Sequence, residues 1–266
     1  MSTTPEPLAQ AYVLKRQEGG VVTLTLNRGD RLNSLSQAMI AALHASLEGV
    51  ADDATARVVV LAGTGKAFCA GHDLKEMAAH PDETWQKALF DQCSHMMVFM
   101  TRMPQPVIAR VHGVATAAGC QLVSMCDLAV AAESARFAVS GVNFGLFCSS
   151  PSVGLSRNVG RKQAMEMLLT GDFIDAPTAL ERGLVNRVVP DSELDAEVGR
   201  LCEALLAKCP AAIRLGKRLF YEQLEQGLDG AYAKANAVMA RNATTEDFAE
   251  GMEAFASKRK PVWRGR

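Results

Sequence analysis

The spacing of apolar residues changes repeatedly along the first two thirds of the chain. Short β-branched runs predict strands at residues 21–26, 57–62, 107–111, 127–131, 136–139 and 185–189. Between them, helical spacing predicts a helix from 36 to 50, which Ser36 can cap, and another from 85 to 103, which Pro104 ends. This order of strands and helices favours an α/β fold.

From Asp191 the strand-like runs stop and only helical spacing remains. Two spacings resemble the capping boxes that begin helices, Ser192 with Asp195 and Thr244 with Asp247. Pro210 stands where a first helical turn tolerates proline. We therefore expect two parts, an α/β body at residues 1–195 and a helical C-terminal region at residues 196–266.

The composition is that of an ordinary globular protein, with 48% apolar and 21% charged residues in a chain of 266. The formal net charge of −1 gives no general attraction for nucleic acid or for an anionic membrane. No apolar run approaches the roughly 20 residues that cross a bilayer. The segment Met1–Pro7 lacks the basic and apolar stretches of a secretory signal. These features predict a cytoplasmic protein without nucleic-acid or membrane partners.

The seven cysteines and five histidines show none of the spacings that hold metal ions. Neither a C-x-x-C nor an H-E-x-x-H pattern occurs, so we expect no metal site. A chain of this length does not need disulfides for stability, and we expect its cysteines to stay reduced as small apolar residues. They are Cys69, Cys93, Cys120, Cys126, Cys148, Cys202 and Cys209.

Two stretches rich in glycine and alanine follow predicted strands, at residues 66–74 and 112–122. Small residues at such a junction let a ligand approach the backbone, where the free N–H groups of the first helical turn attract negative charge. Two junctions that face each other would form an oxyanion hole with two donors. Tight packing alone explains the small residues equally well, so both interpretations stay open.

Four motifs carry a resemblance to a known family: A-F-C-A-G-H-D-L, P-V-I-A-R-V-H-G-x-A-x-x-A-G-C-Q-L-x-x-x-C-D, G-R-K-Q-A-M-E-M-L-L-T-G-D and A-F-A-S-K-R-K-P-V-W. Nearly the whole chain, from Val13 to Trp263, resembles the crotonase (enoyl-CoA hydratase/isomerase) superfamily. The resemblance implies an α/β fold, a spiral of ββα units with a C-terminal helical trimerisation region. It also implies a homotrimer or a dimer of trimers that takes an acyl-CoA thioester as substrate or ligand and needs no further cofactor.

The resemblance places the thioester oxygen between two backbone N–H groups, those of His72 and Ala118. The family usually has glycine at the position of Ala118. Alanine keeps the N–H group, and the hole survives if this residue does not need a positive φ angle. Further residues match positions that contact CoA in the family, the last two from a neighbouring subunit: Arg28, Arg31, Lys66, Ala70, Phe255 and Lys258. Each cation among them is equally explained as a solvated surface charge.

The chain departs from the family where hydration needs carboxylates. Gln121, Gly141 and Ser149 occupy the positions where members of the superfamily carry their catalytic acids. An amide cannot exchange a proton near pH 7, and the other two residues carry no acid. Because a general acid or base is worth roughly 10² to 10⁴-fold in rate, losing two of them would remove about 5 to 11 kcal/mol of transition-state stabilisation. Efficient hydration is therefore not expected, although the oxyanion hole is retained.

A reaction that needs only enolate stabilisation would suit such a site. Decarboxylation of a malonyl-type thioester is one candidate and thioester hydrolysis is another. The His72 side chain is of a type suited to acid–base work. A non-catalytic acyl-CoA-binding protein is the alternative from a different class. Glutamate introduced at positions 121 and 141 would produce hydration if the carboxylates alone are missing.

Overall fold

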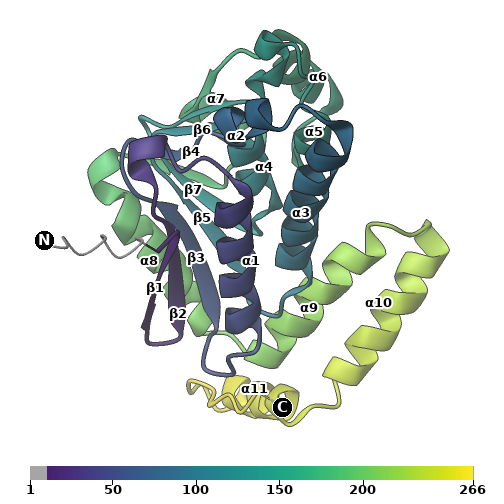
Figure 1. The fold of residues 1–266 in the computed structure, drawn as a ribbon. Coiled ribbons are helices and arrows are strands. Elements are labelled where there is room, and N and C mark those ends of the chain that lie inside the picture. The colour runs from purple at the N-terminus through teal and green to yellow at the C-terminus, as the bar shows by residue number, and fades with distance from the viewer. Residues whose placement is uncertain (1–10, 266) are drawn as a thin grey trace, which may run out of the picture.

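The computed structural model describes residues 11–265 (Figure 1). Its larger sheet has six strands, in the order β1 (Val13–Glu18), β2 (Val21–Leu26), β3 (Val58–Gly63), β5 (Val107–Val111), β7 (Leu128–Ala132) and β10 (Arg187–Val189). β1 and β2 are antiparallel, and every other neighbouring pair is parallel. β3 is buried on both faces along nearly its whole length, as its continuous apolar run predicts.

The smaller sheet has four strands, in the order β4 (Ala67–Cys69), β6 (Val114–Thr116), β8 (Arg136–Ala138) and β9 (Ile174–Asp175). Consecutive strands alternate between the sheets, because β4, β6 and β8 directly follow β3, β5 and β7 along the chain. Helices connect each such pair to the next. This repeated strand–strand–helix order confirms the predicted α/β spiral.

Helices cover both faces of the larger sheet. α1 (Gln37–Ala51) and α3 (Glu83–Arg102) pack on the face that carries Val59 and Leu61. α8 (Leu194–Leu206) packs on the opposite face, with Val58 and Val60. The shorter elements are α2 (Leu74–Ala79), α4 (Ala118–Met125), α5 (Ser149–Asn158), α6 (Arg161–Thr170), α7 (Ala176–Glu181) and the 3₁₀ turns η1 (Gly29–Arg31), η2 (Ser140–Phe144) and η3 (Asp191–Glu193).

Only helical elements follow Asp191, as predicted. The last three are α9 (Pro210–Gln223), α10 (Leu228–Asn242) and α11 (Glu246–Ala256). α9 leads outward to α10, which lies away from the body, and α11 returns beneath it (Figure 1). α9 begins at the predicted proline, and α10 has no buried residue. The predicted boundary between residues 195 and 196 falls inside α8, and the division into two parts stays a prediction.

Helix starts were predicted with mixed success. Ser36 caps α1, since its hydroxyl accepts a backbone N–H of the first turn. The capping boxes predicted at Ser192 and Thr244 are wrong. Glu193 precedes α8 without a side-chain cap, and Thr245, one residue later than predicted, caps α11. Asp195 instead accepts from Arg110, and the Thr244 hydroxyl donates to the Arg241 carbonyl oxygen.

Three further observations bear on the sequence predictions. All seven cysteines are free, as predicted, and six of them are buried. Within residues 11–265 there is no helix long and apolar enough to cross a membrane, and no group of three or more His, Cys, Asp or Glu that could hold a metal ion. Met1–Pro7, the segment predicted not to be a secretory signal, lies outside the described residues.

Candidate active site

The two junctions rich in glycine and alanine meet in the structure. Gly71, which follows β4, has a φ angle of +90° and packs against the residues that begin α4. A Cβ atom at Gly71 would lie 2.9 Å from the Ala117 Cβ atom and 3.3 Å from the Ala118 backbone nitrogen. A side chain at this position would push the two junctions apart, and glycine also adopts the required backbone conformation without strain.

The second junction is held from two further sides. A Cβ atom at Gly119 would lie 2.0 Å from the carbonyl oxygen of Cys69, so α4 packs directly on the backbone of β4. The hydroxyl groups of Thr116 and Ser140 are 2.9 Å apart, which ties the end of β6 to the start of η2. Close packing therefore explains the glycine in α4. It does not explain the backbone N–H groups at the same place that have no acceptor.

Two backbone N–H groups at this contact have no acceptor among residues 11–265, those of His72 and Ala118. Ala118 is the first residue of α4, so its N–H group has no partner within the helix. The positive φ angle of 50° falls on Ala117, which precedes the helix, and not on Ala118. The condition set for alanine at position 118 is therefore met, and the arrangement suits a carbonyl oxygen that gains negative charge.

The His72 side chain is half-buried beside α3. Its ring centre lies 5.4 Å from that of Phe90, in an edge-on arrangement. Burial lowers the pKa of His72 from 6.5 to about 4, so the imidazole is uncharged near pH 7. An uncharged imidazole with this pKa is a poor proton donor and a weak base at neutral pH, which argues against acid–base work by this side chain.

The three positions without carboxylates lie in different surroundings. Gln121, one turn into α4, is 5% exposed, and its Oε1 atom is buried without a hydrogen-bond partner in the described part of the chain. Gly141 lies in η2, where its N–H group donates to Cys148 Sγ at 3.3 Å. Ser149 begins α5 and is exposed, with its hydroxyl donating to the Phe147 carbonyl oxygen.

Position 141 has no room for a side chain. A Cβ atom there would lie 2.4 Å from the Leu146 carbonyl oxygen and 2.8 Å from Cys148 Sγ. The Leu146 N–H group donates to the Gly141 carbonyl oxygen at 3.0 Å, which holds this loop closed on itself. A glutamate at position 141 would therefore displace backbone. The expectation that two substitutions would simply supply two carboxylates needs correction on this point.

Two loops at the other side of β4 pack against each other. A Cβ atom at Gly29, in residues 28–31, would lie 2.9 Å from the backbone nitrogen of Gly65, in residues 64–66. The Asn33 side chain fastens them together, because its Nδ2 atom donates to three backbone carbonyl oxygens in the second loop and β4. The candidate CoA-binding cations stand on these two loops.

The cations are held to different degrees. The Arg28 guanidinium lies 4.0 Å over the centre of the Tyr12 ring. Arg31 and Lys66 are exposed. Ala70 is half-buried and directly follows β4. Its N–H group donates to the carbonyl oxygen of Leu32, the residue after the first loop. The structure thus brings four of the six predicted CoA contacts to these two packed loops and the adjoining end of β4.

Phe255 and Lys258 are not part of this group. They lie in and just after α11, at the opposite end of the molecule from β4 and α2, which flank the first junction (Figure 1). Phe255 is 84% exposed, and Lys258 is exposed as well. One chain therefore does not bring these two residues to the site, and they could reach a site only in another chain.

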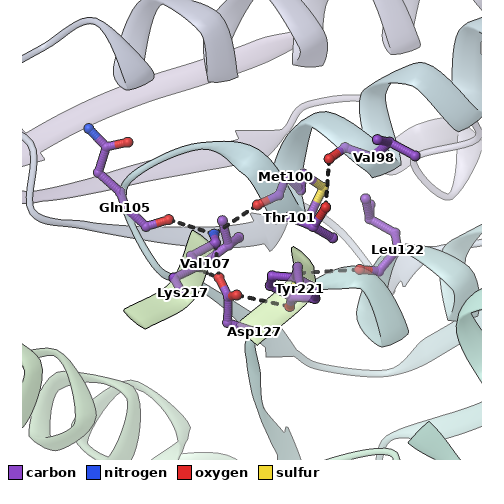
Figure 2. A network of polar contacts seen from close by, with 10 residues as sticks. Val98, Met100, Thr101, Gln105, Val107, Leu122, Asp127, Lys217 and Tyr221 are labelled. Atoms are coloured by element: carbon purple, nitrogen blue, oxygen red, sulfur yellow. Dashed lines mark hydrogen bonds and ion pairs between the residues drawn. The ribbon is translucent and has the colours of Figure 1, made fainter. Parts of the chain in front are cut away.

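A buried polar network just beyond the C-terminal end of α4 was not predicted (Figure 2). Lys217 of α9 donates to the Asp127 carboxylate at 2.7 Å and to the carbonyl oxygens of Met100 and Gln105. Tyr221, one turn later, donates to the same carboxylate at 2.9 Å. The sequence places Lys217 and Tyr221 four residues apart, on one face of a helix. Their shared partner, Asp127, lies 90 residues before Lys217 in the chain, so spacing does not reveal it.

A family model described as enoyl-CoA hydratase/isomerase matches residues 16–266. The chain belongs to the enoyl-CoA hydratase/isomerase family. A crystal structure of an enoyl-CoA hydratase from Mycobacterium smegmatis is 55% identical, with a TM-score of 0.94, and the match covers 96% of this chain and 99% of that one. The human enoyl-CoA hydratase domain-containing protein 3, mitochondrial, is 42% identical over 248 residues, 93% of this chain and 82% of the relative.

A more distant member of the family is the 2,3-dehydroadipyl-CoA hydratase of Escherichia coli (strain K12), 34% identical over 259 residues, 96% of this chain and 98% of that protein. These comparisons confirm the superfamily and the crotonase fold predicted from the motifs. Since one relative is named as mitochondrial, the cytoplasmic location of this family member stays a prediction. The roles assigned to individual site residues stay predictions as well.

Proposed function

We propose that this family member binds an acyl-CoA thioester and stabilises an enolate in an oxyanion hole formed by the backbone N–H groups of His72 and Ala118. The observation that carries the proposal is the contact of Gly71 with the start of α4, where neither N–H group has an acceptor among residues 11–265. Each donor of such a hole is worth roughly 10² to 10³-fold in rate.

Standard hydration is not part of the proposal. Water addition needs one group that activates water and one that manages the proton at the neighbouring carbon. The amide of Gln121 transfers no proton, Gly141 has no side chain, and the surroundings of the His72 ring keep it uncharged near pH 7. Enolate stabilisation is therefore retained without the acid–base groups that hydration uses.

Two reactions and one non-catalytic role remain compatible with such a site. In decarboxylation of a malonyl-type thioester, the electron pair of the breaking C–C bond passes into the enolate and carbon dioxide leaves without a base. Thioester hydrolysis would use the same hole for its tetrahedral intermediate. The second candidate function is acyl-CoA binding without turnover, which the lack of an acid at all three expected positions favours.

We further propose that Arg28, Arg31 and Lys66 bind the CoA phosphates next to Ala70, and that Phe255 and Lys258 contribute from a neighbouring chain. This requires a homotrimer or a dimer of trimers. Large exposed apolar side chains on the last three helices support an assembly, since a monomer rarely exposes so many together. They are Phe220, Leu224, Leu228, Tyr232, Met239, Phe248, Met252 and Phe255.

The test is incubation of the protein with enoyl-, malonyl-type and saturated acyl-CoA thioesters in deuterated water, followed by mass spectrometry. Water addition, deuterium exchange, loss of carbon dioxide and thioester cleavage each give a distinct mass. We expect no appreciable water addition, and loss of carbon dioxide or cleavage would name the reaction. An unchanged panel with saturable thioester binding would assign the non-catalytic role.

Efficient hydration, or failure to bind any thioester, would contradict the proposal. Gly71→Ala should weaken thioester binding, because the added methyl group pushes the two junctions apart. Gly49→Ala in α1 is the matched control, since a Cβ atom there meets nothing within 4 Å. Equal thioester affinity in both variants would show that the contact between the junctions is not the binding site.

A further inference from the structure

The turn that joins β5 to β6, residues 112–113, packs directly on the loop that carries Lys66. A Cβ atom at Gly113 would lie 2.1 Å from the Lys66 carbonyl oxygen, and the φ angle of Gly113 is +62°. Ala67, the first residue of β4, forms an isolated β-bridge with the same glycine. The Lys66 backbone is therefore held by a turn that leaves no space for a side chain at position 113.

The loop of residues 64–66 is held from a second side by the loop of residues 28–31. A Cβ atom at Gly65, where the φ angle is +75°, would lie 2.8 Å from the Cα atom of Gly29. The loop that carries the lysine thus lies between residues 28–31 and the turn. Since the other two candidate phosphate-binding cations stand on residues 28–31, the position of this loop determines how the three charges are spaced.

His112, the first residue of the turn, is half-buried and adds a directed contact to this packing. Its Nε2 atom lies 3.0 Å from the carbonyl oxygen of Gly65, the residue before Lys66. A carbonyl oxygen only accepts, so Nε2 carries the proton of this hydrogen bond. The turn therefore holds two consecutive carbonyl groups of the loop, that of Gly65 by a hydrogen bond and that of Lys66 by contact.

The other ring nitrogen of His112 faces Arg110. Arg110 Nη1 lies 3.5 Å from Nδ1, and a guanidinium group only donates, so Nδ1 is the nitrogen without a proton. Arg110 Nε is itself paired with the Asp195 carboxylate at 2.5 Å. Burial, the largest influence, lowers the pKa of the ring, and the charge of Arg110 lowers it further. The Gly65 carbonyl and the charges of Asp195 and Asp191 raise it, and the net pKa lies below 6.5. The ring is therefore neutral near pH 7, with its one N–H group directed at the loop.

Resting on the proposed function, we infer that His112 is a positioning residue for CoA binding. Its Nε2–H group holds the Gly65 carbonyl and thereby sets the loop from which the Lys66 ammonium reaches the CoA phosphates. His112 itself contacts no part of the ligand in this role. Without the hydrogen bond the loop samples more conformations, and ordering it when the ligand arrives costs binding free energy.

The experiment is isothermal titration calorimetry of the full-length protein with butyryl-CoA. His112→Leu removes the donor and should weaken binding about fivefold, the effect expected for one net hydrogen bond. His112→Gln keeps an N–H donor near the position of Nε2 and should recover most of that affinity. A residue that merely filled space would show the opposite order, because leucine packs in a half-buried position at least as well as glutamine.

A double-mutant cycle tests whether His112 acts through Lys66. Lys66→Met removes the ammonium and should itself weaken butyryl-CoA binding about tenfold. In the Lys66→Met protein, the further change His112→Leu should weaken binding less than twofold, because the loop no longer carries the charge. His44→Leu is the matched control and should bind butyryl-CoA as the wild-type protein does. This histidine is also half-buried, and its ring faces Glu48 of its own helix at 3.8 Å.

Thermal melting checks that each variant is folded, and His112→Ala replaces His112→Leu if leucine prevents folding. Wild-type affinity of either His112 variant without a donor would overturn the inference and leave the proposed oxyanion hole standing. Wild-type affinity of Lys66→Met, equal losses with and without the lysine, or no recovery in His112→Gln would also overturn it. If the wild-type protein does not bind butyryl-CoA at all, the proposed function itself fails and the inference fails with it.

Discussion

Helix α4 begins in the candidate active site and ends beside Asp127, and the buried polar groups at these two ends are satisfied to different degrees. At the first end, His72 Nε2 and Gln121 Oε1 have no partner within residues 11–265, and two backbone N–H groups have no acceptor. The whole region is closely packed and carries no charge near pH 7 on these two side chains.

At the second end the charged groups are fully paired (Figure 2), and the only unpaired buried side-chain atom of the described residues there is Oε1 of Gln105, whose backbone carbonyl oxygen accepts from Lys217. The Asp127 carboxylate accepts from the Val107 N–H group at 2.7 Å, from Lys217 Nζ at 2.7 Å and from the Tyr221 hydroxyl at 2.9 Å. Lys217 uses its remaining donors on two backbone carbonyl oxygens. This network joins α9 to the ends of the core strands.

The difference separates a ligand site from a structural joint. A fully paired network offers nothing to a ligand and stabilises one arrangement of the chain, whereas unpaired buried groups lower stability and are retained where a ligand pairs them. Each prediction below tests whether the two ends of α4 differ in this way, by the effect of a substitution or of pH on the free energy of unfolding.

The largest effect is expected for Lys217→Met. Methionine fills a similar space but leaves the Asp127 carboxylate without its cation and two carbonyl oxygens without a donor. Removing one partner of a buried ion pair costs about 3 to 5 kcal/mol of unfolding free energy. Urea denaturation measures the loss, with Lys162→Met, at an exposed site on α6, as the control. A loss no larger than that of the control would show that the network does not stabilise the fold.

The next effect concerns the pH dependence of stability at the active-site end. Because the pKa of His72 is lowered from 6.5 to about 4, the unfolded chain binds a proton between these pH values that the folded chain does not bind. The stability contribution of the neutral ring is therefore present above pH 6.5 and is lost as the pH falls toward 4, by about 3 kcal/mol. Between pH 7 and pH 4 the unfolding free energy of the wild-type protein should therefore fall further than that of His72→Phe. The two falls should differ by this amount.

All other groups titrate in both proteins, so the difference between the two pH curves isolates His72. Parallel curves would mean that the ring is solvated enough to take up a proton in the folded state. The unpaired Nε2 atom would then be paired with water, and the contrast between the two ends of α4 would be weaker than the structure indicates.

Burial explains why much of the fold could be predicted from apolar spacing. The strands and α1 and α3 each present a continuous buried face, and their periods are visible in the sequence. The failed capping boxes show the limit of local spacing. Asp247, predicted as the acid of a box, instead accepts from the backbone N–H groups of Arg264 and Gly265, 17 and 18 residues later. A contact with such a separation leaves no periodic pattern.

The same limit applied to the site. Its residues were named from family motifs, but the contact of Gly71 with Ala117 depends on the pairing of β4 with β6, which periodicity does not specify. The crowding at Gly141 arises from a loop that returns to it through Leu146 and Cys148. Composition and spacing identified the two junctions. How much room each position leaves for a side chain depends on tertiary packing, which only the folded structure shows.

Crowding at position 141 predicts an intermediate effect for Gly141→Ala. The methyl group would meet the Leu146 carbonyl oxygen, so the loop must shift, at a cost of about 1 to 3 kcal/mol of unfolding free energy. Gly49→Ala, in the last turn of α1 where a Cβ atom meets nothing within 4 Å, should instead stabilise the protein by up to about 1 kcal/mol. Chemical denaturation of both variants measures the difference. Equal effects would mean that the loop is free to move and that a carboxylate could be accommodated there.

The smallest effect, and the sharpest test of the contrast, is expected for Gln121→Met compared with Gln105→Met. Both glutamines are 5% exposed, and both have an Oε1 atom without a partner in the described residues. They differ at the other amide atom, because Gln105 Nε2 donates to the Val50 carbonyl oxygen at 2.8 Å and Gln121 anchors no such carbonyl oxygen. Gln105→Met leaves a buried carbonyl oxygen without its donor and should cost about 1 to 3 kcal/mol.

Gln121→Met removes an unpaired buried polar group, so the free energy of unfolding should stay within about 0.5 kcal/mol of the wild-type value or rise. Urea denaturation in the absence of any thioester is the measurement. If Gln121→Met costs as much as Gln105→Met, its amide is already satisfied in the ligand-free protein. Position 121 would then resemble the Asp127 network, and the two ends of α4 would not differ in the way that the unpaired Oε1 atom indicates.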